Sequence, residues 1–317
     1  MQLDPDAQVL LDAALKAGRP PIETLTPAQA RRQMKELRAA LKRPQPPVAA
    51  VRDLAADGPH GAIPLRLYRS RGDGTLPVVV FFHGGGWVFG DIETHDNLCR
   101  SIANAADCAV VSVDYRLAPE HKFPAAVDDS WAALQWVAAR ADELALERER
   151  IAVAGDSAGG NLATVVSLLA AQDGGVSVRH QVLLYPTVDL GLAHDSFRRA
   201  GARFNLTANA MAWFREHYLN GDHEVDDWRA SPLRAKDLSK QPPAYVATAG
   251  CDPLCDEGEA YARALERHGV PVTFRHFPGQ MHGFAGMSGF VKAADEVVAD
   301  VGAALKQAWE VGGADAR

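Results

Sequence analysis

A serine flanked by glycines is the first feature of this sequence that could do chemistry. Ser157 lies in the run Gly-Asp-Ser-Ala-Gly, with small and β-branched apolar residues before it and an apolar helical pattern after it. A strand that turns sharply into a helix places the residues two before and two after the turn so close that both, here Gly155 and Gly159, must be glycine. Such a turn exposes the hydroxyl at the end of the strand, so Ser157 is predicted to be a nucleophile. A phosphate-binding glycine loop is the alternative, but the run contains neither phosphate-binding pattern, GxxxxGK[ST] or GxGxxG.

A serine alcohol is a weak nucleophile near neutral pH and depends on other groups. It needs a general base, a carboxylate that orients the base, and N–H donors for the oxyanion. The run from His83 to Trp87, with glycine at all three positions between, directly follows a predicted strand at 77–83. Those glycines let backbone N–H groups turn inward with no side chain in the way, so this loop is predicted to supply the donors. A flexible hairpin turn is the other interpretation of the same letters.

The general base is predicted to be His282. It lies in the loop FPGQMHGFAG, after the last predicted strand and before the last predicted helix. A base in that position can reach over the edge of the sheet to meet the serine. Among the other histidines, His276 falls within a strand, His268 near a helix end and His83 within the glycine loop, so these are predicted to be structural or surface residues. A surface role for His282 is the alternative.

The orienting carboxylate is predicted to be Asp252. The segment ATAGCDPLCDEGEA supplies the candidates Asp252, Asp256 and Glu257, and Asp252 is nearest the end of the preceding strand. Asp256 and Glu257 fall in the predicted first turn of a helix, where the helix dipole alone favours a negative charge. The resulting chain order of Ser157, Asp252 and His282 is that of the α/β-hydrolases.

Alternating strands and helices must position these residues. Apolar, β-branched runs predict strands at 62–69, 77–83, 108–114, 150–155, 180–186, 244–250 and 271–277. Helical patterns occupy about 94–107, 124–140, 158–172, 256–269 and 290–309. Near-continuous apolar strands alternating with helices predict an α/β fold with a mostly parallel central sheet and helices on both faces.

Two segments break the alternation and are predicted to form a helical cap. Residues 6–42 read as two helices, and RPQPP at 43–47 separates them from the rest. Residues 190–240 are an aromatic-rich helical insertion. The predicted organisation is therefore cap at 1–45, first part of the core at 46–189, cap insertion at 190–240 and second part of the core at 241–317.

Several motifs together resemble the bacterial hormone-sensitive-lipase family of carboxylesterases, which has the α/β-hydrolase fold. They are HGGGW (83–87), DYRLAPEHKFPAAVDD (114–129), GDSAGGNLA (155–163), DPLCDEG (252–258) and HGF (282–284). The resemblance covers nearly the whole chain. The family pattern DPLRDEG has cysteine here at Cys255, outside the predicted triad, so little effect on the chemistry is expected. The segment from Tyr115 to Pro119 is expected to be a structural loop near the site.

The resemblance implies an activity and an oxyanion hole. It predicts hydrolysis of short- to medium-chain acyl esters through an acyl-enzyme, with the N–H groups of Gly85, Gly86 and Ala158 binding the oxyanion. It implies neither a metal ion nor an organic cofactor. The candidate acyl pocket, whose members could equally pack the cap onto the sheet, comprises Phe204, Leu206, Met211, Trp213 and Phe214. A non-catalytic small-ligand receptor of the same fold, a hydrolase of amides, peptides or lactones, and an interfacial lipase are the alternatives.

Composition bounds the partners. The formal net charge is −7, which argues against a nucleic-acid partner and gives no support to docking on anionic lipid. The first ten residues lack the pattern of a signal peptide, and no apolar run is long enough for a membrane span, so a cytoplasmic location and no stable membrane association are expected. Four cysteines in no framework spacing are expected to be free, partly buried thiols. The expected partner is a small-molecule ester, and a homodimer stays open.

Overall fold

A central sheet organises the molecule, a computed structural model that describes residues 1–40 and 44–311. Its eight strands in spatial order are β1 (Ala50–Gly58), β2 (Gly61–Arg69), β4 (Ala109–Val113), β3 (Leu76–Phe82), β5 (Leu146–Asp156), β6 (Val178–Leu184), β7 (Ala244–Cys251) and β8 (Val272–Met281). The α-helices are α1 (Pro5–Lys16), α2 (Pro27–Ala40), α3 (Ile92–Ala106), α4 (Ala125–Ala139), α5 (Ala158–Asp173), α6 (Asp195–Ala200), α7 (Ala208–Tyr218), α8 (Cys255–Arg267) and α9 (Lys292–Val311). Short 3₁₀ turns are η1 (Ile22–Thr24), η2 (Asp222–Glu224), η3 (Pro232–Arg234) and η4 (Phe284–Gly286).

The order of the strands creates a place for a site beside β3. Strand β2 is antiparallel to both of its neighbours, while the pairs from β4 to β8 are parallel. After β3 the chain crosses to β4 on one side and then returns to β5 on the other side of β3. Loops that leave the carboxyl ends of β3 and β5 therefore diverge, and open α/β sheets bind their ligands at such a point.

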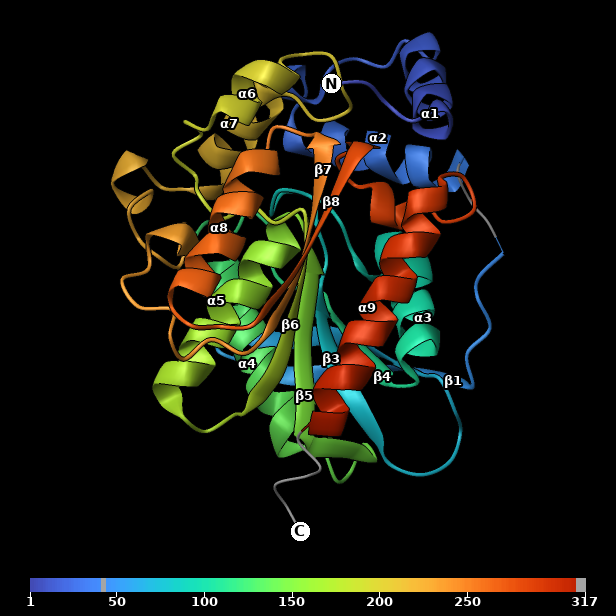
Figure 1. Cartoon of the computed structure of the whole chain (residues 1–317), viewed down its shortest axis with the longest axis vertical. Helices are drawn as coiled ribbons and strands as arrows, with labels where there is room; N and C mark the ends of the chain where they lie inside the picture. The colour runs from blue at the N-terminus through green and yellow to red at the C-terminus, as the bar shows by residue number, and fades with distance from the viewer. Residues whose placement is uncertain (41–43, 312–317) are drawn as a thin grey trace.

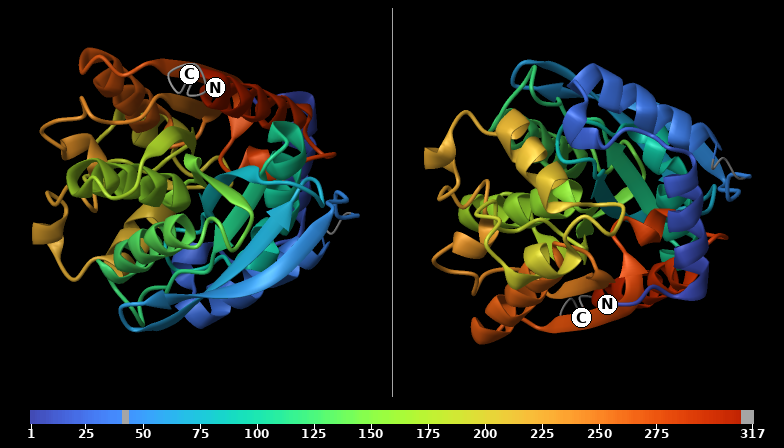
Figure 2. Two further views of the ribbon diagram at one scale, coloured as in Figure 1. Left: turned by 90° about the horizontal axis from the view of Figure 1, so that it is seen from below. Right: turned by 90° about the horizontal axis from the view of Figure 1, so that it is seen from above.

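Helices cover both faces of the sheet, as the alternation predicted. Helices α3 and α9 pack on one face, and α4, α5 and α8 lie on the other (Figures 1 and 2). All residues of β3 are buried, and their side chains alternate between the two faces. Val78, Val80 and Phe82 join the core under α4 and α5, whereas Val79 and Phe81 join the core under α3 and α9. A strand buried on both faces explains the unbroken apolar run in the sequence.

The helices outside the alternation gather at one end of the sheet. Figure 1 shows α1, α2, α6 and α7 at the end toward which the arrows of β7 and β8 point. The N-terminal segment is tied there, because Asp4 N–H donates to the carbonyl of Gly279 at 2.8 Å. Helices from both segments of the predicted cap, the N-terminal residues and the insertion, thus lie at the carboxyl ends of the strands.

The structure differs from the predicted elements mainly at the first strand. No strand was expected at Ala50–Gly58, yet β1 forms there as the sheet's edge strand, paired with β2. Most of its residues are exposed and several are polar, so the apolar signal for a strand is missing. Strand β8 runs four residues past the predicted end, to Met281, and delivers His282 directly at the sheet edge. Residues 41–43, part of the predicted second helix and linker, lie outside the described residues.

The cysteines and the helix lengths bear on two further expectations. Cys99, Cys108, Cys251 and Cys255 are all free, as predicted, and all four are buried rather than partly buried. In the part of the chain that the structure describes, no helix is long and apolar enough to cross a membrane. A cytoplasmic location stays a prediction from the sequence.

Candidate active site

The turn from β5 into α5 has the geometry that the glycines predicted. Ser157 has a φ of 57° and a ψ of −119°, a conformation rare for a residue with a side chain. A Cβ added to Gly155 would lie 2.2 Å from the carbonyl oxygen of Gly159, and one added to Gly159 would lie 1.9 Å from the carbonyl oxygen of Phe82. Neither position has room for a side chain because backbone atoms occupy the space. The strained turn therefore depends on glycine at both positions.

Three side chains from three loops meet at this turn. The imidazole Nε2 of His282 lies 2.9 Å from the hydroxyl oxygen of Ser157, and its Nδ1 lies 2.7 Å from Oδ2 of Asp252. A carboxylate can only accept, so Nδ1 carries the hydrogen and Nε2 is left as an acceptor for the serine proton. The structure thus brings together the three residues that the sequence analysis had selected, in a line that can withdraw a proton from the alcohol.

Asp252 is the carboxylate of its segment that faces the histidine. It is fully buried, and its other oxygen, Oδ1, accepts from the N–H of Leu254 at 2.9 Å. Asp256 instead bonds the N–H of Ser196. Glu257 accepts from the N–H of Val188 at 2.7 Å, and burial raises the pKa of its carboxyl well above the usual range. These contacts give the other two candidate carboxylates, Asp256 and Glu257, structural partners.

The glycine loop after β3 turns beside the serine. Gly85 and Gly86 have φ values of 119° and 59°, in the region that favours glycine. The N–H of Gly84 donates to Oδ1 of Asp156 at 2.8 Å, which ties the loop to the residue before the nucleophile. Within the described residues, the N–H groups of Gly85, Gly86 and Ala158 have no hydrogen-bond acceptor. They are therefore available to a ligand oxygen.

His83 packs against Tyr115 at the start of the glycine loop, and its imidazole is neutral at neutral pH. Its ring stacks on Tyr115 with centroids 4.2 Å apart, and the Tyr115 hydroxyl donates to the carbonyl of His83 at 2.6 Å. Burial lowers the pKa of His83 to about 4. The segment around Tyr115 is thus a structural loop next to the site, as expected. The role of Asp156 was missed, although its place beside the serine within the glycine motif is the signal that could have drawn attention to it.

Side chains from the inserted segment approach the site from two directions. A Cβ added to Gly86 would lie 2.2 Å from the Phe214 ring, so this ring covers the glycine loop. Asn205 donates from Nδ2 to the carbonyl of His282 at 2.7 Å. Phe204 instead packs with the cluster of Leu3 and its neighbours from α1. No local pattern in the sequence points to Asn205, because its contact depends on how the insertion folds back.

Comparisons with known proteins agree with this geometry. The family model described as alpha/beta hydrolase fold matches residues 79–286. This chain belongs to that family. The carboxylic ester hydrolase LipN of Mycobacterium tuberculosis is 45% identical over 290 residues, which cover 89% of this chain and 77% of that protein. The ethyl acetate hydrolase of Pseudomonas putida is 37% identical, with 97% of this chain and 99% of that protein covered.

Solved structures extend the likeness of this α/β-hydrolase to the whole fold. The hyperthermophilic esterase from Pyrobaculum calidifontis is 41% identical, has a TM-score of 0.93 and covers 97% of this chain, with 99% of its own chain matched. The resemblance to the hormone-sensitive-lipase family is confirmed by these relatives. The protein is accordingly an enzyme, a carboxylic ester hydrolase acting on small-molecule esters.

Proposed function

We propose that this α/β-hydrolase cleaves esters through an acyl-enzyme formed on Ser157. Neutral His282 takes the proton from the serine hydroxyl as its oxygen attacks the ester carbonyl, and Asp252 holds the imidazole in the required tautomer and stabilises the imidazolium. The observation that carries the proposal is the unbroken pair of contacts of 2.9 and 2.7 Å through the imidazole. His282 then protonates the leaving alcohol.

Deacylation repeats the same steps with water as the nucleophile. His282 removes a proton from water, the hydroxide attacks the acyl carbon, and Ser157 leaves with the proton that the imidazole returns. The imidazole must be neutral to begin either half-reaction, so kcat/KM is expected to fall on acidification. Ester and water are consumed, and carboxylic acid and alcohol are released.

The oxyanion is assigned to the N–H groups of Gly85, Gly86 and Ala158. Ala158 begins α5, so the positive end of the helix dipole adds to its N–H. Loss of one such donor typically raises the barrier by about 3 kcal/mol. The tie between Gly84 and Asp156 supports the assignment because it fixes the loop relative to the serine before the substrate arrives.

The N-terminal residues 1–45 and the insertion 190–240 are proposed to form the cap over the site, joined to core segments 46–189 and 241–317. Phe214 lies against Gly86, next to the proposed oxyanion hole, so the space for an acyl chain is bounded by an aromatic ring. This supports short- to medium-chain acyl esters as substrates. The printed name of one relative, ethyl acetate hydrolase, agrees with a short ester.

Labelling and one variant test the mechanism. An organophosphate is expected to modify Ser157 covalently, with the adduct located by peptide mass mapping. Ser157→Ala is expected to fold normally by circular dichroism and to lose turnover of p-nitrophenyl butyrate by about 10⁴-fold or more. A Ser157→Ala protein with near wild-type turnover, or an adduct on another residue, would refute the assignment. A chain-length series of aryl esters tests the substrate range, and matched amides test the alternative substrate class.

A further inference from the structure

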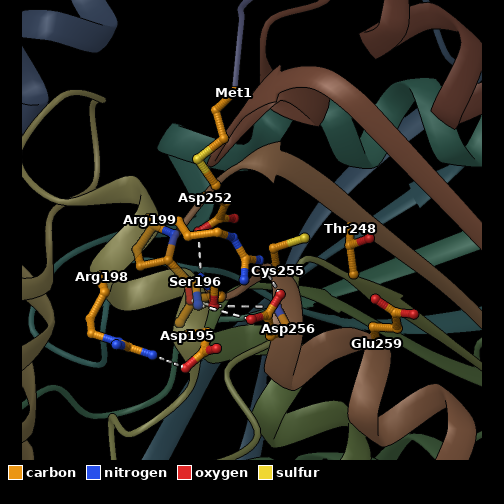
Figure 3. A network of polar contacts seen from close by, with 12 residues as sticks. Met1, Asp195, Ser196, Arg198, Arg199, Thr248, Asp252, Cys255, Asp256 and Glu259 are labelled. Carbon is orange, nitrogen blue, oxygen red and sulfur yellow. Dashed lines mark hydrogen bonds and ion pairs between the residues drawn. The ribbon is translucent and has the colours of Figure 1, made fainter.

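A buried serine from the inserted segment contacts the loop that carries Asp252. Ser196, in α6, is fully buried, and its hydroxyl donates to the carbonyl oxygen of Pro253. Pro253 directly follows Asp252. Figure 3 shows Ser196 in the middle of this polar network, close to Asp256 and Arg199. A side chain far from Asp252 in sequence therefore reaches the loop that carries this orienting carboxylate.

The carbonyl that Ser196 binds shares a peptide unit with the N–H that orients Asp252. The carbonyl of Pro253 and the N–H of Leu254 lie in one rigid plane. That N–H donates to Oδ1 of Asp252 at 2.9 Å, and Oδ2 of the same carboxylate accepts from His282 at 2.7 Å. Fixing the carbonyl end of the plane therefore fixes the direction of the N–H at its other end.

Further contacts hold Ser196 in place. Its N–H donates to Oδ2 of Asp256 at 2.9 Å, and its Oγ accepts from the N–H of Asp256 at 3.3 Å. Arg199 donates to Oδ1 of the same carboxylate. With Oγ accepting from one side, its hydrogen is left to point at Pro253. The neighbouring Asp195 pairs with Arg198 on the exposed side of α6.

We propose that Ser196 is a positioning residue for the ester hydrolysis. Its hydroxyl sets the Pro253–Leu254 peptide, which aims the Asp252 carboxylate at His282. Hydrogen bonds in such a chain reinforce one another in a buried site. Docking of α6 is thereby linked to how well the imidazole accepts the serine proton. The inference rests on the proposed function of Ser157, His282 and Asp252.

Ser196→Ala tests the proposal, with activity normalised to active sites titrated by an organophosphate. A displaced Asp252 carboxylate is expected to lower kcat by about tenfold with KM little changed, since small displacements at a reacting centre are costly. The acid limb of the kcat/KM profile moves to lower pH, because the imidazolium loses part of its stabilising partner. The downfield proton resonance of the His282 Nδ1–H weakens or shifts. Ser196→Thr, which keeps the hydroxyl, restores these readouts, and Asp195→Asn on the same helix leaves them unchanged.

A purely structural role gives a different result. Ser196→Ala would then lower the melting temperature and the titrated fraction, while kcat per titrated site, the acid limb and the proton resonance match the wild type; this outcome overturns the proposal. The resonance can also be followed in Ser157→Ala, which makes no turnover under the proposed function. If Ser157→Ala remained active, the proposed function itself would fail, and the two failures are therefore distinguishable.

Discussion

The two halves of the site are held in place by opposite means. On the nucleophile side, Gly155 and Gly159 allow backbone to approach backbone, and any side chain would be excluded by contacts shorter than van der Waals separation. On the acid–base side, the loops bearing Asp252 and His282 are held by side chains that reach in from elsewhere, such as Asn205. The nucleophile side therefore does not tolerate added atoms, whereas the acid–base side depends on hydrogen bonds from particular side chains. Adding a side chain on the nucleophile side should therefore lower stability, whereas removing a supporting side chain on the acid–base side should lower activity.

The largest effect on stability is expected from adding one methyl group on the nucleophile side. In Gly159→Ala the new Cβ would lie 1.9 Å from the Phe82 carbonyl oxygen, which belongs to a central strand and cannot move aside. A loss of unfolding free energy on the order of 4 kcal/mol is expected, measured by urea denaturation. Gly72→Ala is the matched control, since an added Cβ there meets nothing within 4 Å. Equal stability of the two variants would contradict the account of this half.

A buried histidine far from both halves allows acid unfolding of the protein to be separated from protonation of the site. His180 lies near the start of β6, at the opposite end of the strand from the site, and burial lowers its pKa to about 4. The unfolded chain binds this proton below about pH 6.5, so stability is lost as the pH falls from there toward 4. His180→Leu should recover up to about 3 kcal/mol of that loss by pH 4.

Urea denaturation at several pH values measures this effect. At pH 7.5 the activity of His180→Leu should match that of the wild type, because no part of the site is altered. If the stability difference between variant and wild type were the same at pH 4.5 and pH 7.5, the buried neutral state of His180 would be refuted. An acid limb of activity that persists in the variant belongs to the site.

The smallest effect is expected from removing one side-chain support on the acid–base side. Asn205→Ala loses the 2.7 Å hydrogen bond to the carbonyl of His282, a kind of bond that contributes about 1 kcal/mol to stability. The imidazole is then held less firmly, and a loss of kcat/KM of about fivefold or less is expected. Steady-state kinetics normalised to titrated sites measures this loss, and Asn209→Ala, at an exposed position of α7, is the control. An activity equal to that of the control would show that the histidine loop needs no support from the insertion.

Much of the architecture followed from local patterns in the sequence. Strand β3 was predictable because its residues are buried on both faces and therefore all apolar. The turn at Ser157 was predictable because its backbone excludes side chains, which leaves glycine as a visible mark. Strand β1 was missed because an exposed edge strand needs no apolar pattern. Its pairing with β2 supplies what its composition does not.

Local sequence patterns were enough to predict the fold class, the candidate serine, histidine and aspartate, and the positions where only glycine fits. Each of these depends on properties that a residue carries alone or with near neighbours. The contacts of Asn205 with His282 and of Ser196 with the peptide next to Asp252 arise only when the chain folds. Each of these hydrogen bonds joins one ordinary polar side chain to a backbone carbonyl, which every residue carries. Such residues carry no local signature, and only the folded chain brings them to their partners.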